Sequence, residues 1–173
     1  MRNFFKIFGT LTFLTLFLSQ GQSATFPTGP DSRLTIGTLC EHGSSLRYEE
    51  KIEYCSRSVS SSKKWDIIDR YEALGYEIRR YGRYNFKIDH LIPLCAGGSN
   101  EESNLWPQHS SVYIKTDKIE GMICQLMAKG EMLQEEAVRL ILDVKSNLET
   151  ANDVELDLSE RLSELKGLSL QKH

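Results

Sequence analysis

The stretch 86–108, FKIDHLIPLCAGGSNEESNLWPQ, constrains the fold of this chain more than any other part. Its first four residues alternate apolar and polar side chains, which is the period of a strand. Pro93 ends that strand or restricts it to a sheet edge. Glycines and an asparagine at 96–100 predict a turn, and residues 105–106 predict a second strand that Pro107 stops. We therefore expect two short strands joined by a turn.

Helices are expected on both sides of these strands. Apolar residues at helical spacing predict helices over 61–74, 110–129 and 134–149. Trp65 has the position of a core residue, and the alternative is an exposed ring that stacks on a base. The segment 34–54 shows no clear period and is expected to be a loop. The fold class is therefore α+β.

The sequence divides into four segments. Residues 1–23 combine a basic start, an apolar run of 12 residues and small residues near the end, which is typical of a cleaved signal peptide and too short for a membrane span. Residues 24–33 are expected to be a linker and 34–150 a single domain. Residues 151–173 predict an amphipathic helix or a fraying tail. The mature chain is expected to be secreted or periplasmic, with no part in a membrane.

The four cysteines are Cys40, Cys55, Cys95 and Cys124. Export favours disulfides, and four buried free thiols are the alternative. Three pairings exist, of which we prefer Cys40–Cys55 with Cys95–Cys124 because the first bond closes a short local loop, a stabilisation of about 3 kcal/mol. No Cys-x-x-Cys pair is present, which disfavours a zinc ribbon.

Charge is unevenly distributed along the chain. Without residues 1–23 the net charge is −5, which is not typical of a nucleic-acid binder. The segment 57–87 nevertheless has eight basic and four acidic residues, whereas 119–173 has six basic and eleven acidic ones. Residues 79–87 interleave basic and aromatic side chains, which suits phosphates and bases but equally suits a solvated turn. The candidate nucleic-acid contacts there are Arg79, Arg80, Arg83 and Lys87.

The predicted hairpin holds polar residues, glycines and an aromatic residue at characteristic spacings: Asp89, His90, Gly97, Gly98, Asn104, Trp106 and Pro107. In these residues the chain resembles the HNH nuclease superfamily, and most of all secreted HNH-like proteins with an Asp-His-Leu-Ile-Pro-Leu, Gly-Gly-Ser-Asn and Asn-Leu-Trp-Pro signature. The resemblance covers 88–108, with a weaker similarity over about 37–141. It implies a ββα-metal core of two strands and a helix, here with additional helices and disulfides.

The resemblance also implies the roles of three residues. It makes His90 the general base, a role that suits an imidazole with an unperturbed pKa near 6.5. It makes Asp89 a metal ligand and Asn104 the residue that fixes the loop and orients His90. Adjacent residues of a regular strand point to opposite faces, so we expect a distorted strand end that lets Asp89 and His90 serve one cavity.

The helix after the hairpin departs from the family's pattern. The family commonly places a His or Asn there, whereas this chain has Tyr113 and Ile114, and neither side chain is a normal ligand for a hard cation. Asp117, one helical turn further on, is the candidate ligand, and the alternative is an exposed residue paired with a lysine. His109 and Glu120 are further candidates.

The ligand types decide the expected metal. The divalent cation would neutralise the phosphate and stabilise the leaving oxygen. A pair of carboxylates, Asp89 and Asp117, favours Mg²⁺, with Mn²⁺ as the alternative, and a contribution from His109 would make Zn²⁺ suitable.

The sequence therefore predicts a secreted, metal-dependent endonuclease of HNH type that hydrolyses phosphodiester bonds of DNA and acts as a monomer. Two alternatives stay open. A catalytically inactive module on the same fold would bind nucleic acid or a cell-envelope polymer, which the departure at Tyr113 and the net charge of −5 favour. A purely structural secreted protein would have no metal affinity.

Overall fold

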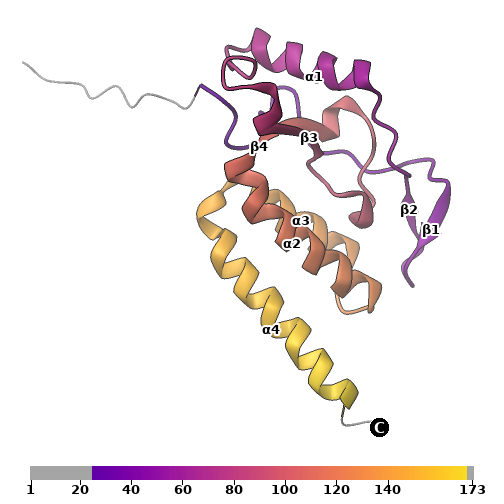
Figure 1. The fold of residues 1–173 in the computed structure, drawn as a ribbon. Coiled ribbons are helices and arrows are strands. Elements are labelled where there is room, and N and C mark those ends of the chain that lie inside the picture. Colours follow the sequence, from indigo (N-terminus) through magenta and orange to yellow (C-terminus); the bar gives the residue numbers. More distant parts are fainter. Residues whose placement is uncertain (1–24, 171–173) are drawn as a thin grey trace, which may run out of the picture.

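The computed structural model describes residues 25–170 and their side chains up to residue 168, so the predicted signal peptide at 1–23 lies outside the described residues. Four helices and two small two-stranded sheets make an α+β fold, as predicted (Figure 1). In chain order the elements are β1 (Ser45–Arg47), β2 (Ile52–Tyr54), α1 (Ser61–Ala73), β3 (Phe86–His90), β4 (Leu105–His109), α2 (Ser110–Ala128), α3 (Gln134–Ser146) and α4 (Ala151–Leu170).

The central feature is the antiparallel hairpin of β3 and β4, which leads directly into α2. His90 lies opposite Leu105 and Asp89 opposite Trp106. The prediction that Pro107 stops the second strand was wrong, because β4 continues to His109. Both strands of a two-stranded sheet are edges, and an edge strand tolerates a proline.

Two hydrophobic clusters lie on either side of this hairpin. One joins α1 to the hairpin and includes Ile68, Tyr71 and Trp106. The other joins α2, α3 and α4 and includes Ile123 and Leu158. Figure 1 shows the same division, with α1 above the hairpin and the other three helices below it. The C-terminal segment is therefore a packed helix rather than a fraying tail.

The prediction of a core position for Trp65 was wrong. Helix α1 begins after Ser60, whose side chain accepts a hydrogen bond from the N–H of Lys63, so the helix starts where the sequence predicts. Its buried face is formed by Ile67, Ile68 and Tyr71. Trp65 is 46% exposed on the other side of the helix.

The segment predicted to be a loop, 34–54, contains the β1–β2 hairpin. The turn of this hairpin places Tyr48 and Lys51 at positive φ angles, 60° and 58°, where glycine or asparagine is usual. The turn therefore has none of the residues that usually identify a hairpin in a sequence.

The segment predicted to be a linker, 24–33, packs on the domain from Thr25 onward. The ring of Phe26 contacts the rings of Phe86 and His109, and the carbonyl of Thr25 accepts a hydrogen bond from the N–H of Glu77 at 2.7 Å. A proline-rich segment can be tied down when it supplies an apolar side chain to a core.

Both predicted disulfides, Cys40–Cys55 and Cys95–Cys124, are present. The first fastens the β1–β2 hairpin to the preceding loop, and the second fastens the turn after β3 to α2. No helix within residues 25–170 is long and apolar enough to cross a membrane.

Candidate active site

The loop after β3 is held by the fully buried side chain of Asn104. Its Oδ1 accepts from the N–H of Ile92 at 2.8 Å, and its Nδ2 donates to the carbonyls of Ile92 at 3.0 Å and Ser99 at 2.9 Å. At Gly98 a Cβ would lie 1.8 Å from the carbonyl oxygen of Ile92, so only glycine fits. The asparagine and this glycine together fix the course of the loop that follows His90.

The imidazole of His90 is buried between two polar side chains. Its Nε2 lies 3.1 Å from Oδ1 of Asn100, an oxygen that can only accept, so Nε2 carries the proton. The amide of Asn100 is itself oriented, because its Nδ2 donates to the carbonyl of Ser56. Nδ1 of His90 lies 3.3 Å from Nη1 of Arg57, which can only donate. The ring is therefore neutral, with a lone pair on Nδ1.

The pKa of His90 agrees with this assignment. Burial lowers the pKa below its usual value, and the positive charge of Arg57 lowers it further, against the hydrogen bond to Asn100, which raises it. At neutral pH the imidazole therefore has no proton on Nδ1 and can accept one there. That is the state a general base requires.

Asp89 belongs to a different set of contacts. Its Oδ2 accepts a hydrogen bond from the ammonium of Lys145 at 3.1 Å, and its Oδ1 lies 3.5 Å from the ammonium of Lys87. Burial alone would raise the pKa of Asp89, but the two ammonium groups outweigh burial and hold this pKa below its usual value. Among residues 25–168, the Asp89 carboxylate pairs with Lys145 and Lys87, whereas the His90 ring contacts Arg57 and Asn100. The two side chains therefore face different partners, and the expectation that both serve one cavity stays a prediction.

Lys145, on α3, is fully buried and links three groups. Its Nζ lies 3.1 Å from Asp89 Oδ2, 2.6 Å from Glu120 Oε1 and 2.5 Å from the carbonyl oxygen of His90. The contact with Glu120 is an ion pair without hydrogen-bond geometry, since this oxygen accepts no well-aligned hydrogen bond. The carboxylates raise the pKa of Lys145 more than burial lowers it, so the ammonium stays charged.

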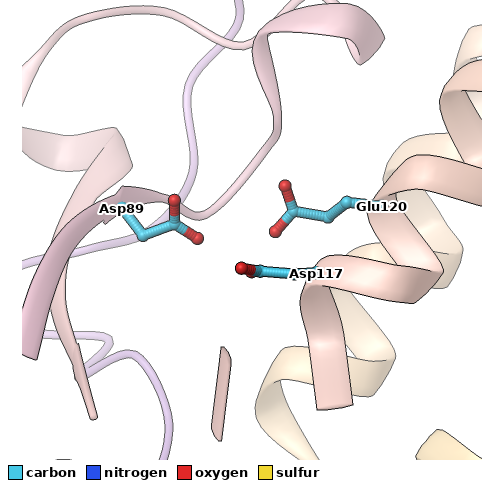
Figure 2. A group of neighbouring side chains, drawn as sticks. All are labelled: Asp89, Asp117 and Glu120. Carbon is cyan, nitrogen blue, oxygen red and sulfur yellow. The ribbon is translucent and has the colours of Figure 1, made fainter. Parts of the chain in front are cut away.

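The carboxylates of Asp89, Asp117 and Glu120 form an acidic cluster between β3 and α2. One oxygen of each lies within 4.8 Å of the others, and Figure 2 shows the three side chains pointing toward one another. The predicted ligand Asp117 is in the cluster, with an ion pair of 2.5 Å to Lys87. Glu120, named as a further candidate, completes it.

The acidic cluster has the oxygen ligands that Mg²⁺ or Mn²⁺ prefers. However, the ammonium of Lys145 already lies between Asp89 and Glu120, and the ammonium of Lys87 lies between Asp89 and Asp117. These two internal cations balance most of the cluster's charge and contact one or both oxygens of each carboxylate. In this arrangement a divalent metal would have to displace the ammonium groups or share these oxygens with them.

His109 lies apart from the acidic cluster. Its Nδ1 accepts a hydrogen bond from the N–H of Ser111 and caps the start of α2, and its ring stacks on Phe26 at 4.2 Å. Tyr113, at the position where the resemblance to HNH nucleases would place a helix ligand, lies beside the ammonium of Lys87, 5.1 Å from its ring centroid.

The predicted nucleic-acid contacts differ in whether a carboxylate already pairs with them. Arg79 pairs with Asp69 and Glu72, and Arg80 pairs with Glu77. Lys87 is held in the acidic cluster. Arg83 has no carboxylate partner among the residues that the structure describes, and it donates to the carbonyl of Phe86 at 2.7 Å.

Three residues near the site were not found from the sequence: Arg57, Asn100 and Lys145. Asn100 belongs to the Gly-Gly-Ser-Asn signature, so its place in the motif was a usable signal. Arg57 and Lys145 carry no local signal, because only the tertiary fold brings them to β3.

The buried carboxyl of Glu120 gives a testable pH dependence. Burial raises its pKa to about 7. A raised folded-state pKa stabilises the protein below the unfolded value, and this stability is lost as the pH rises through about 7. His90, whose pKa is lowered, acts in the opposite direction between its own folded pKa and its usual value. As the pH rises from 5 to 8, we therefore expect the stability of Glu120→Gln to increase relative to that of the unchanged protein. Urea midpoints measured at each pH give this difference. An equal pH profile for both proteins would contradict this assignment.

Comparisons of the chain with models of known protein families, with curated proteins and with solved structures find no match.

Proposed function

We propose that this protein hydrolyses phosphodiester bonds of nucleic acid, with His90 as the general base of an HNH-like ββα unit. The observation that carries the proposal is the state of His90: Asn100 fixes the proton on Nε2, and Nδ1 keeps its lone pair beside the guanidinium of Arg57. A base that faces a phosphate-binding group is the arrangement that this hydrolysis requires.

In the proposed reaction a phosphate of the substrate displaces Arg57 from Nδ1 and pairs with its guanidinium. Arg57 is exposed, so substrate can reach it. Nδ1 of His90 then takes a proton from a water molecule while the water oxygen forms its bond to phosphorus. The bond from phosphorus to the leaving oxygen breaks, and this oxygen takes a proton from solvent. Asn100 holds the imidazolium through Nε2, as an oriented acceptor does in a catalytic triad.

We further propose that the buried ammonium of Lys145 occupies the place of the predicted divalent cation. Lys145 has no exposed surface and cannot touch a substrate. It is therefore a positioning residue, which holds Asp89 to Glu120 and fixes the carbonyl of His90 at the end of β3. On this proposal cleavage needs no added metal, in contrast to the expectation from the resemblance.

The proposed location is outside the cytoplasm. Its support is the predicted signal peptide together with two disulfides, which persist in oxidising compartments. DNA is the substrate proposed from the resemblance, and the proposed state is a monomer.

A second candidate function has an observation of its own. Both ring nitrogens of His90 already have partners, and internal cations fill the acidic cluster. A closed site of this kind suits a module that binds nucleic acid and does not cleave it.

The deciding experiment incubates the mature, oxidised protein with supercoiled plasmid and with single-stranded DNA, in EDTA and separately in Mg²⁺, Mn²⁺ or Zn²⁺. We expect nicking in EDTA at a rate that added metal changes little, and no heat of metal binding by calorimetry. Cleavage that requires a metal, together with metal binding that Asp117→Asn abolishes, would contradict this proposal and support a metal site in the acidic cluster. Binding without cleavage in every condition would favour the second candidate. A His90→Ala preparation distinguishes cleavage by this protein from a contaminating nuclease.

A further inference from the structure

A groove on α1 and the segment before β3 combines exposed aromatic rings with basic side chains. It has a volume of about 430 Å³ and is lined by Ser61, Lys64, Trp65, Arg83 and Tyr84, which we call the aromatic groove. Trp65 is 46% exposed and Tyr84 is 98% exposed. Large aromatic side chains gain little from folding when they stay in water, so two exposed rings in one groove indicate a binding surface.

The charges of the aromatic groove select the kind of ligand. No acidic side chain lines it. The guanidinium of Arg83 lies 5.7 Å from the ring centroid of Trp65, close to the limit of a cation–π contact. In a chain with net negative charge, a groove that combines two basic side chains with two exposed rings is complementary to a strand of phosphates and bases.

The aromatic groove is connected to the candidate active site through α1. Lys63, next to Lys64, donates from Nζ to the carbonyl of Asn100 at 3.0 Å. Asn100 in turn holds Nε2 of His90. Lys63 and Lys64 lie in the first turn of α1, where positive charge interacts unfavourably with the helix dipole, and no acidic residue in that turn compensates for them. A ligand with negative charge would relieve this unfavourable arrangement.

We propose that the aromatic groove binds unpaired nucleotides of the nucleic-acid strand whose phosphodiester bond His90 attacks. The proposal rests on the proposed function for the identity of the ligand. Bases can stack on Trp65 and Tyr84 only where they are not paired in a duplex, and Lys64 and Arg83 contact the phosphates between them. The expected substrate is therefore single-stranded nucleic acid or a duplex with an unpaired region.

The fluorescence of Trp65 can report this interaction directly. The chain has two tryptophans, and Trp106 is fully buried, so a stacking base should quench the emission of Trp65. The His90→Ala protein, which should not cut its ligand, is titrated with a ten-residue oligothymidylate and with an abasic deoxyribose-phosphate oligomer of equal length. We expect saturable quenching by the oligothymidylate and binding at least about 10-fold weaker for the abasic oligomer, as measured by fluorescence and calorimetry.

Single variants distinguish the contribution of base stacking to the affinity from that of electrostatic attraction to the phosphates. Trp65→Ala and Tyr84→Ala should each weaken oligothymidylate binding by about 10- to 100-fold, and Lys64→Ala should weaken both oligomers equally. The matched controls are Ile114→Ala, an exposed apolar residue on α2, and Arg161→Ala, a cation on α4 already paired with Glu136; neither should change binding. Equal affinity for the two oligomers, or unchanged binding in both aromatic variants, would overturn the proposal. Because binding is measured in a protein that does not cleave, a failure of catalysis does not affect this outcome.

Discussion

Replacing His90 by alanine is expected to lower the rate of phosphodiester cleavage by about 10²- to 10⁴-fold, the usual contribution of a positioned general base. The loss follows from Nδ1, whose lone pair faces Arg57 and which in the proposed reaction takes the proton of the attacking water. Cleavage is measured on a fluorescently labelled single strand with the protein in excess, so that one turnover is observed.

The pH profile of the proposed cleavage by the unchanged protein should report the same residue. Burial and Arg57 lower the pKa of His90, so the imidazole stays neutral below its usual value of 6.5. Cleavage should therefore remain at its plateau from neutral pH to below 6.5 and fall only when the pH passes the lowered pKa.

Two variants make the assignment of His90 specific. His90→Gln keeps a polar side chain of similar length without a basic nitrogen, and it should lose activity as His90→Ala does. His42→Ala changes an exposed histidine in the loop between Cys40 and β1 and should cleave at the original rate. Urea unfolding of each variant shows whether the protein is still folded. Activity in a folded His90→Ala protein close to that of the original would show that His90 is not the base.

Replacing Lys145 by methionine is expected to destabilise the protein by about 3–5 kcal/mol, the usual cost of removing one partner of a buried ion pair. Methionine has similar length and fills the volume, so the loss reports charge rather than a cavity. Asp89 and Glu120 would be left buried together without their common cation. The free energy of unfolding is measured in urea with both disulfides oxidised.

A double-mutant cycle tests whether this energy arises in the acidic cluster. In a Glu120→Gln background one buried carboxylate is already neutral, so Lys145→Met should cost clearly less than in the unchanged protein. The control is Arg139→Met, which removes an exposed cation from the same helix and should change stability by no more than about 0.5 kcal/mol. A cost below about 1 kcal/mol for Lys145→Met would mean that its ammonium does not hold the acidic cluster together.

The sequence predicted the elements that local patterns determine. Helices α1 and α2 begin and end within a residue or two of the predicted bounds, because each has a start or stop signal at its ends: Ser60 caps α1, and Gly130 follows α2 with a φ of 75°. The resemblance likewise implied that Asn104 fixes the loop, a place that suits an asparagine because its side chain can accept and donate at once.

Other features depend on contacts that no local pattern contains. Trp65 lies at a helical spacing that fits the core, yet the position of the hairpin decides which face of α1 is covered. Lys145 belongs to the buried side of an amphipathic helix, where a lysine usually extends to solvent. Only the meeting of α3 with β3 explains why its ammonium is buried.

The place of Lys145 in the chain also determines how far the motif can be separated from the rest of the protein. Asp89 and Glu120 lie within the contiguous hairpin and helix, but their shared cation arrives 56 residues after Asp89, on α3. A fragment that ends with α2 would contain the whole signature and Lys87, but not the buried ammonium that pairs with Asp89 and Glu120. The strand, turn and helix are therefore not a transplantable unit in this protein: grafting 86–128 onto another scaffold would also require a buried cation from the host.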